Sequence, residues 1–454
     1  MKYTIQELAQ ILNAKNVKTI NDKLVTGLEI DSRKVKEGDL FVPFIGEKAD
    51  GHNFITKAIE NKAAATLSLK EDINEEINTL YVEDSLLAIQ TLARDYLTKL
   101  NAKVVAVTGS NGKTSTKDII AEILSTKYKV HKTDGNFNNE LGMPLTILAA
   151  PEDTEILVLE MGADGFNQLD LLSDIAKPDF AVITNIGESH IEFFGDRGGI
   201  AKGKFEIVEG LKEDGIFVYN GDEELLNSLV EKSSIKAVKC GFEKGNDILV
   251  ESFKQEKDHI TFKLNSFEKE AVSRLKGKHN LLNIMYASVI AKNLGLNEDE
   301  IIAALENLDK ITKMRLESIN YGDNSLIIND AYNASPTSMK AAIDVLEDLE
   351  DFNYKTIILG DMYELGPSEA DFHKEVGYYL NKNTDTSINR LISVGDLGKH
   401  ISDVTTNEKI EKLHFDNKED IAKYLLDKKQ DKEVILFKAS RGMKLESIIE
   451  EMLK

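Results

Sequence analysis

The sequence contains one cysteine, Cys240, among its 454 residues. A single cysteine excludes an intrachain disulfide, so the fold is compatible with a reducing compartment. Cys240 itself is expected to be a small packed residue rather than a nucleophile. No apolar run approaches the roughly 20 residues that a membrane-spanning helix needs, and residues 1–7 lack the pattern of a signal peptide. These absences lead us to expect a soluble cytoplasmic protein without a membrane span.

Positive charge is also scarce, because 56 lysines and arginines stand against 78 aspartates and glutamates, a formal net charge of −22. Nucleic-acid backbones require a basic face, so nucleic acid is not an expected partner. An anionic substrate would have to be bound by local glycine loops, lysines, arginines and metal ions. At about 150 residues per domain, the length predicts about three domains.

The stretch most informative about function begins with the apolar residues 104–107 and continues through a small, polar turn into residues 117–124. Apolar residues recur there at helical spacing, which predicts a strand, a phosphate-binding loop and a helix. Backbone N–H groups, the helix N-terminus and Lys113 would bind an anion, and Thr114 would offer a hydroxyl to Mg²⁺. The predicted loop residues are Gly109, Ser110, Asn111, Gly112, Lys113 and Thr114. The alternative is a turn without a ligand.

Alternating strand and helix patterns follow, which favour a mainly parallel sheet covered on both faces. Glu160 ends one apolar run, and Asn185 and His190 follow another. Ligands of open α/β sheets bind beyond the carboxyl ends of the strands, so Glu160 and His190 can converge on the loop. Carboxylate and hydroxyl oxygens suit Mg²⁺, whereas imidazole is a less usual ligand. A structural role for His190 is the alternative.

Other polar residues admit two interpretations each. Asn280 and Asn283 lie three apart at a helix start, where amides can contact a base or cap the helix. Ser32, Arg33 and the turn at residues 50–52 follow short predicted strands and are either functional or only turn-forming. Composition and pattern changes near Asn101 and Arg315 predict domains at 1–100, 101–313 and 314–454, the last also doubly wound.

Together these motifs resemble the Mur ligase superfamily over essentially the whole chain. The motifs are residues 108–114, 160–162, 184–187 with His190, 277–280 with Asn283, and 330–333. Within that family, residues 31–52, 332–339 and 359–362 resemble the member that joins D-alanyl-D-alanine to UDP-N-acetylmuramoyl-tripeptide.

The resemblance implies an α/β fold of three domains: a small UDP-binding domain, a central P-loop ATPase domain and a C-terminal Rossmann-like domain. It also implies an ATP-driven amide ligation that completes the cytoplasmic peptidoglycan precursor in bacteria. The tripeptide carboxylate would attack the γ-phosphate of ATP to give an acyl phosphate, which the amine of D-alanyl-D-alanine would then attack. In phosphoryl transfer the protein contributes mainly positioning of the reactants and stabilisation of charge. A monomer is expected.

The resemblance also assigns roles to residues. Lys113 would steady the β- and γ-phosphates, Thr114 and Glu160 would hold one Mg²⁺, and His190 would help hold a second. Lys204 matches the family lysine that becomes carbamylated and then contacts metal as an anion, with Lys202 as the alternative position. The resemblance thus gives catalytic roles to Lys113, Glu160, His190 and Lys204.

Further positions match nucleotide and substrate contacts of the family. Asn280 and Asn283 match adenine contacts, and Arg315 and Asp330 match contacts to the phosphates and ribose. The implied substrate-binding residues are Ser32, Arg33, Asp50, Gly51 and His52 for UDP, with Asn138, Asn139, Tyr332 and Asn333 for other parts of the substrates.

Two features depart from the family pattern, namely Ser335 in place of an expected asparagine and the run 165–169 after Gly162. A sister ligase that adds a single amino acid is the nearest alternative function. A nucleotide-dependent binding protein that uses the same loop is an alternative from a different class.

Overall fold

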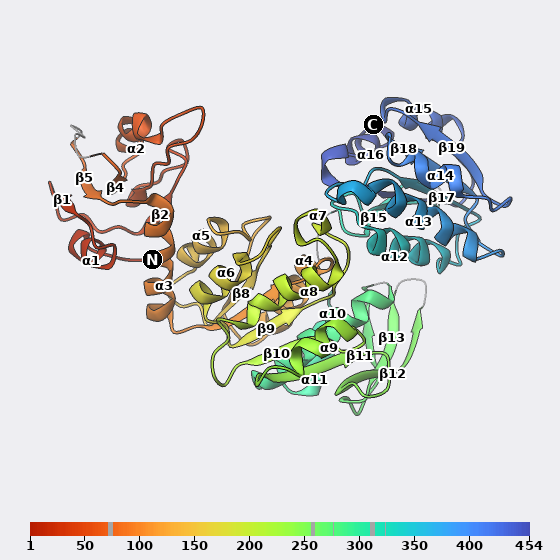
Figure 1. Ribbon diagram of the computed structural model, residues 1–454, viewed down its shortest axis with the longest axis horizontal. Helices are drawn as coiled ribbons and strands as arrows, with labels where there is room; N and C mark the ends of the chain where they lie inside the picture. Colours follow the sequence, from red (N-terminus) through yellow and green to blue (C-terminus); the bar gives the residue numbers. More distant parts are fainter. Residues whose placement is uncertain (71–75, 256–258, 276, 309–313, 323) are drawn as a thin grey trace.

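The computed structural model describes residues 1–70, 76–255, 259–275, 277–308, 314–322 and 324–454. Across these residues the strands form three sheets, one in each of three successive parts of the chain (Figure 1). The predicted α/β class with mainly parallel sheets is confirmed. The predicted boundary at residue 313 borders residues 309–313, which lie outside the described residues.

The N-terminal sheet is parallel except at β1, which pairs antiparallel to β5. Its order is β1 (Asn16–Lys18), β5 (Asn78–Tyr81), β4 (Ala65–Ser68), β3 (Asp39–Phe41) and β2 (Gly27–Glu29). The helices of this part are α1 (Ile5–Ile11), η1 (Gly51–Phe54), α2 (Ile55–Glu60) and α3 (Ser85–Leu100). A capping box at Thr4 and Glu7 starts α1, as the sequence predicts.

The central sheet is parallel from β7 to β12 and ends in two antiparallel strands. Its order is β14 (Ala271–Ser273), β13 (Ile260–Leu264), β12 (Ile248–Gln255), β11 (Lys236–Gly241), β10 (Ile216–Asn220), β9 (Phe180–Ile183), β6 (Lys103–Thr108), β8 (Ile156–Glu160) and β7 (Val130–Lys132). The helices are α4 (Lys113–Ser125), α5 (Gly142–Ala149), α6 (Gln168–Ala176), α7 (Ile191–Phe194), α8 (Arg197–Phe205), η2 (Glu206–Val208), α9 (Glu224–Val230), α10 (Lys278–Asn293) and α11 (Glu298–Glu306).

Strand β6 has no solvated face. Val104 and Ala106 pack into one hydrophobic core, and Val105 and Val107 pack into another on the opposite side of the sheet. Side chains alternate between the faces of a strand, so a continuous apolar run is what a doubly covered parallel strand requires. The first core continues through α3 into the N-terminal part, and α3 lies beside α5 and α6 (Figure 1).

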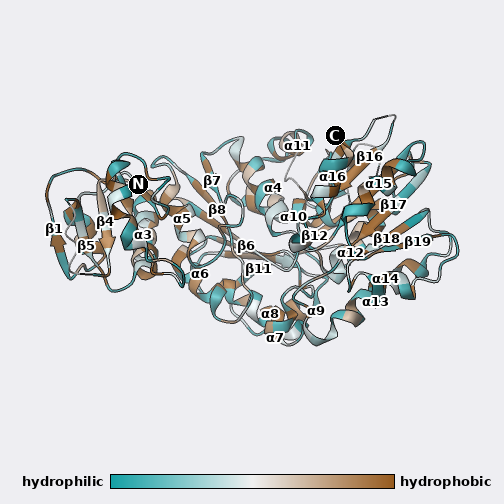
Figure 2. Ribbon diagram, turned by 90° about the horizontal axis from the view of Figure 1, so that it is seen from above, coloured by the Kyte–Doolittle hydropathy of each residue, from teal (hydrophilic) through white to brown (hydrophobic). Residues whose placement is uncertain are grey.

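The C-terminal sheet is parallel except for β15, which pairs antiparallel to β16. Its order is β15 (Glu317–Asn320), β16 (Leu326–Asn329), β20 (Glu433–Lys438), β17 (Tyr354–Leu359), β18 (Arg390–Val394) and β19 (Glu411–Phe415). Its helices are α12 (Pro336–Glu347), η3 (Gly366–Ser368), α13 (Glu369–Lys382), α14 (Lys399–Val404), α15 (Glu419–Asp427), η4 (Arg441–Met443) and α16 (Glu446–Met452). Separate cores lie on its two faces, and Figure 2 shows the hydrophobic strands β17 and β18 among more hydrophilic helices.

Among the described residues, no helix is long and apolar enough to cross a membrane.

Candidate functional site

The phosphate-binding loop connects β6 to α4, as the sequence predicts. Gly109 has a φ of +146°, and a Cβ built there would lie 1.9 Å from Oγ1 of Thr184, so only glycine fits. Gly112, with a φ of +79°, precedes the first turn of α4. The turn thus brings the loop to a helix N-terminus, where free backbone N–H groups and the helix dipole favour an anion.

The end of β9 fixes the conformation of this loop. Asn185 accepts hydrogen bonds from the backbone N–H groups of Asn111 at 2.8 Å and Ser110 at 3.2 Å. Thr184 donates its hydroxyl to the carbonyl of Asn111 at 2.5 Å. Residues that follow β9, the neighbour of β6 in the sheet, therefore fix the loop, which gives a binding surface with little reorganisation on anion binding.

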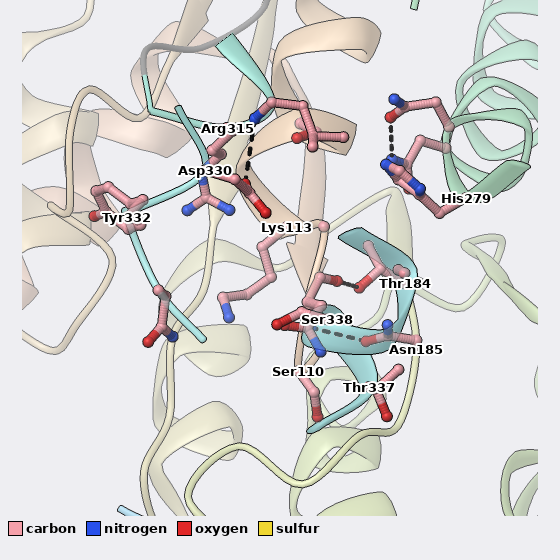
Figure 3. A pocket seen from close by; sticks show the side chains of 18 of the residues that line it. Ser110, Lys113, Thr184, Asn185, His279, Arg315, Asp330, Tyr332, Thr337 and Ser338 are labelled. Carbon is pink, nitrogen blue, oxygen red and sulfur yellow. Dashed lines mark hydrogen bonds between the residues drawn. The ribbon is translucent and has the colours of Figure 1, made fainter. Parts of the chain in front are cut away.

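A cavity of about 340 Å³ opens over the loop, between the central part and the C-terminal part. It brings together residues predicted for nucleotide and substrate from six separate stretches of sequence (Figure 3). The predicted residues that line it are Ser110, Asn111, Gly112, Lys113, Asn138, Glu160, Asn280, Asn283, Arg315, Asp330, Tyr332 and Asn333.

Lys113 extends from the first turn of α4 into this space (Figure 3). Its Nζ donates to the carbonyl of Gly109 at 2.8 Å. Burial lowers the pKa of Lys113, Glu160 raises it and Arg315 lowers it. The ammonium is thus desolvated and lies close to a second cation, an arrangement that a polyanion would stabilise.

The C-terminal part supplies Arg315, Asp330 and Tyr332 to the same cavity (Figure 3). The guanidinium of Arg315 stacks on Tyr332 at 4.4 Å, and its buried Nε has no hydrogen-bond partner among the described residues. Asp330 pairs with Lys438 at 2.5 Å. A buried guanidinium nitrogen without a partner is costly, so this side of the cavity is suited to an anionic ligand.

Thr114 and Glu160 form the pair of oxygen groups expected for Mg²⁺. Oγ1 of Thr114 donates to Oε2 of Glu160 at 2.8 Å, and Asn138 donates to Oε1 at 2.9 Å. Glu160 is buried, and its backbone N–H donates to Oγ1 of Thr133 at 2.9 Å. Hydroxyl and carboxylate oxygens are ligands that Mg²⁺ prefers, so this pair fits the ion.

His190 and Lys204 do not line the cavity but lie close to it. Burial lowers the pKa of His190 to about 4, with further lowering by Lys204 and Lys113 and an opposite effect from Asp164. Burial likewise lowers the pKa of Lys204 to about 7. Lys113 lowers the pKa of both His190 and Lys204, so the two side chains lie near the phosphate-binding loop. Within the described residues, no group of three or more His, Cys, Asp or Glu side chains is placed to hold a metal ion.

The two lysines on α8 that are candidates for carbamylation differ in their exposure to solvent. Lys204 is 1% exposed and donates to the carbonyl of Ala163 at 3.0 Å, whereas Lys202 is exposed. With a pKa of about 7, the Lys204 amine has a substantial neutral fraction near pH 7, and a neutral amine is the form that reacts with carbon dioxide. The surroundings of Lys204 therefore fit carbamylation.

On α10, Asn283 is more constrained than Asn280. Oδ1 of Asn283 accepts from Thr116 at 2.9 Å and its Nδ2 donates to Asn280 at 3.0 Å. Asn283 is buried and connects α10 to α4. Neither asparagine is the N-cap of α10, a position that Gly277 occupies.

The predicted UDP residues do not line the cavity and lie in the N-terminal part. Asp31 forms an ion pair with Arg33 at 2.7 Å, and Oδ1 of Asp50 lies 2.7 Å from Nδ1 of His52. Nε2 of His52 accepts from the backbone of Leu69 at 3.0 Å. Ser32 and His52 are buried, whereas Arg33 is exposed. Asn139 is also outside the cavity, where it accepts from the backbone of Gly142 at the start of α5.

The cavity residues that the sequence reasoning gave no role include His279, Thr337 and Lys438. Lys438 is the last residue of β20, so a polar residue at a strand end was a usable signal. Thr337 lies in the first turn of α12, and its hydroxyl donates to Oε2 of Glu188 in the central part at 2.8 Å. No local pattern indicated that contact.

Family models match most of the chain. They are the Mur ligase family, catalytic domain, at residues 24–123, the Mur ligase middle domain at 107–291, and the Mur ligase, glutamate ligase domain, at 314–441. The UDP-N-acetylmuramoyl-tripeptide–D-alanyl-D-alanine ligase of Bacillus subtilis strain 168 is 42% identical, over 100% of this chain and 99% of that protein. The chain belongs to the Mur ligase family.

Solved structures of family members agree with this assignment. MurF from Acinetobacter baumannii is similar with a TM-score of 0.89 at 28% identity, covering 100% of this chain and 99% of that one. MurF ligase from Thermotoga maritima in complex with ADP is similar with a TM-score of 0.84 at 33% identity, covering 95% and 98%. The three-part Mur ligase architecture therefore extends over this whole chain.

Proposed function

We propose that this protein is the ATP-dependent ligase that joins D-alanyl-D-alanine to UDP-N-acetylmuramoyl-tripeptide. The observation that supports this most directly is the cavity over the phosphate-binding loop, whose lining combines Lys113 with Arg315 and Asp330 from another part of the chain. The Bacillus relative, which carries this activity in its name and aligns from end to end, supports it further. The single-amino-acid ligase and the nucleotide-dependent binding protein receive no comparable support.

The proposed reaction needs charge neutralisation more than covalent participation by the protein. We propose that the loop N–H groups and Lys113 bind the β- and γ-phosphates and that Arg315 reaches the phosphates from the C-terminal part. Asn280 and Asn283 would meet the adenine, and Asp330 the ribose. Enclosure between two parts of the chain would keep water from the acyl phosphate.

We propose that Thr114 and Glu160 hold one Mg²⁺ and that His190 and a carbamylated Lys204 help hold a second. Such ions offset the repulsion between an anionic nucleophile and the phosphates. The lysine supports this role only after modification, because an ammonium would repel a cation.

The substrates would span the molecule. We propose that Ser32, Arg33, Asp50, Gly51 and His52 belong to the surface that binds UDP, and that Asn138, Asn139, Tyr332 and Asn333 meet other parts of the substrates. Domains at 1–100, 101–313 and 314–454, a monomeric state and a cytoplasmic location in bacteria are also part of the proposal.

ADP release tests this function. Purified protein is mixed with ATP, Mg²⁺ and UDP-N-acetylmuramoyl-tripeptide in its lysine or diaminopimelate form, with and without D-alanyl-D-alanine. The ligase assignment requires that release depend on both the nucleotide peptide and the dipeptide. Equal release without them would leave an ATPase and overturn the ligase assignment.

A further inference from the structure

A buried lysine at the carboxyl end of β20 lies at the cavity, although the proposed reaction gives it no role. Lys438 is the last residue of β20, is 3% exposed and lines the cavity. Its backbone is fixed by β17, because its carbonyl accepts from the backbone N–H of Gly360 at 3.0 Å. Lysine is rarely buried unless its ammonium is paired, so the partners of this group indicate what it does.

The ammonium of Lys438 connects the two ends of the turn that follows β16. Nζ donates to Oδ2 of Asp330, the residue after β16, at 2.5 Å, and to the carbonyl of Asn333 at 3.1 Å. The backbone N–H of Asp330 donates to the carbonyl of Phe437 at 2.9 Å, so the end of β20 holds both its backbone and its side chain. Lys438 thus closes residues 330–333 into a fixed turn.

This turn presents Tyr332 to Arg315. The guanidinium of Arg315 lies over the ring of Tyr332, 4.4 Å from its centroid, and both residues line the cavity (Figure 3). Such stacking attracts a cation to the face of the ring. The ring therefore supports the guanidinium, and the position of the ring depends on the turn that Lys438 closes.

Asp330 supports Arg315 by a second route. Its Oδ1 accepts from the backbone N–H of Leu316 at 3.2 Å. Met314 and Leu316, the two neighbours of Arg315, have left-handed backbones with φ values of +61° and +51°. That conformation is uncommon outside glycine and persists only where the surrounding structure holds it. The carboxylate that Lys438 contacts therefore also fixes the backbone from which Arg315 extends.

Both routes begin at Lys438 and end at Arg315. We propose that Lys438 is a positioning residue that directs the guanidinium of Arg315 toward the phosphates of the nucleotide, through Asp330 on one side and Tyr332 on the other. A group that is already held in place binds its ligand without the cost of being ordered. This inference rests on the proposed role of Arg315 at the phosphates and names the residue that sets its direction.

ADP binding in the presence of Mg²⁺, measured by isothermal titration calorimetry, tests the inference without turnover. Lys438→Met removes the ammonium and keeps an unbranched side chain. Because it leaves Asp330 without its cation, it can cost stability. Lys438→Gln is the milder variant, since its amide can still donate to the carboxylate, and it decides the question if the methionine variant does not fold. Thermal unfolding of every variant is measured in parallel.

Lys355 provides the matched control. It lies near the start of β17, at the opposite edge of the same sheet, and is 4% exposed. Its Nζ donates to the carbonyl of Glu347 at 2.8 Å and to Oγ of Ser387 at 2.8 Å. Lys355→Met should therefore lower the unfolding temperature and leave ADP affinity unchanged, which is the response expected of a buried lysine with a purely structural role.

We expect Lys438→Met to weaken ADP binding by about 10-fold, a coupling typical of residues that share one hydrogen-bonded network. Lys438→Gln should weaken it less. Arg315→Met should weaken ADP binding at least as much as Lys438→Met. The double variant of Lys438 and Arg315 should lose clearly less than the product of the two single losses, because Lys438 acts through a guanidinium that is already absent.

Three outcomes would overturn the inference alone. Unchanged ADP affinity in the folded Lys438 variants, with a loss in Arg315→Met, would leave the phosphate role of Arg315 standing and remove Lys438 from it. Losses that multiply fully in the double variant would show that Lys438 acts independently of Arg315. An equal loss in Lys355→Met would reduce Lys438 to a structural residue. Unchanged affinity in Arg315→Met would instead overturn the proposed role of Arg315, and the inference with it.

Discussion

The side-chain amide of Asn111 in the phosphate-binding loop donates to Oγ of Ser335, at the start of α12, at a distance of 3.1 Å. Ser335 is also the N-cap of α12, where it completes a capping box with Ser338. The residue that departs from the family pattern is therefore both a helix cap and a contact between two parts of the chain.

Replacement of Ser335 by alanine should destabilise the protein by about 1–2 kcal/mol, since loss of an N-cap hydroxyl typically costs this much. The Michaelis constant for ATP should also rise, because Asn111 loses its partner across the cavity. Ser335→Asn, which can still cap the helix, is the control in chemical denaturation and in kinetics. Equal stability of the alanine variant and the original would contradict the capping role.

Lys113→Ala should reduce turnover by about 10²–10³, the usual effect of removing one preorganised charge donor. Among the described residues, the Lys113 side chain makes one hydrogen bond to the backbone, to the carbonyl of Gly109, so its loss should leave the fold intact. Steady-state ADP release, with circular dichroism as a check on the fold, measures this. Near-normal turnover would refute the phosphate role of Lys113.

Lys204→Ala should abolish most activity, and a small added carboxylic acid should restore part of it by replacing the carbamate. Lys202→Ala is the matched control and should remain active, because Lys202 is exposed on the same helix. Rescue assays with acetate or propionate separate the two. If Lys202→Ala is the inactive variant, the assignment of the modified lysine is wrong.

The buried His373 should make stability depend on pH. Burial lowers its pKa below the ordinary value of 6.5, so the native state binds fewer protons than the unfolded state. The stabilising contribution is present above pH 6.5 and is lost as the pH falls below it. Protonation would also break the hydrogen bond that Nε2 accepts from Met362.

Thermal unfolding at pH 7.5 and pH 5.5 measures this effect, and His373→Gln isolates it from the other histidines. The variant should be less stable at pH 7.5 and should lose less stability than the unmodified protein on acidification. An identical pH dependence of the two proteins would show that His373 does not contribute.

Local pattern was sufficient to predict the unit from β6 to α4. The apolar run 104–107, the glycines and the helical spacing all act within about 20 residues, and the structure has the strand, loop and helix at those places. The α/β class and family membership are confirmed as well. The convergence of Arg315 and Asp330 on the loop was anticipated only through the family resemblance.

Contacts between distant stretches could not be read from pattern. Glu188 with Thr337 and His190 with Glu364 depend on how the C-terminal part docks, and no periodicity encodes that geometry. Lys438 was overlooked because a lysine at the end of a strand usually reaches solvent, whereas here it is buried against Asp330.

The core shared by the N-terminal and central parts has a consequence for how the molecule comes apart on heating. Residues from Tyr3 to Leu226 contribute to one continuous hydrophobic cluster, so the first two parts should melt together as a single cooperative unit. The C-terminal part has cores of its own and meets the rest across a more polar boundary, so it should melt in a separate transition. A calorimetric scan should therefore resolve two peaks rather than three. ADP, which would contact both sides of the boundary, should reduce the difference between the two transition temperatures.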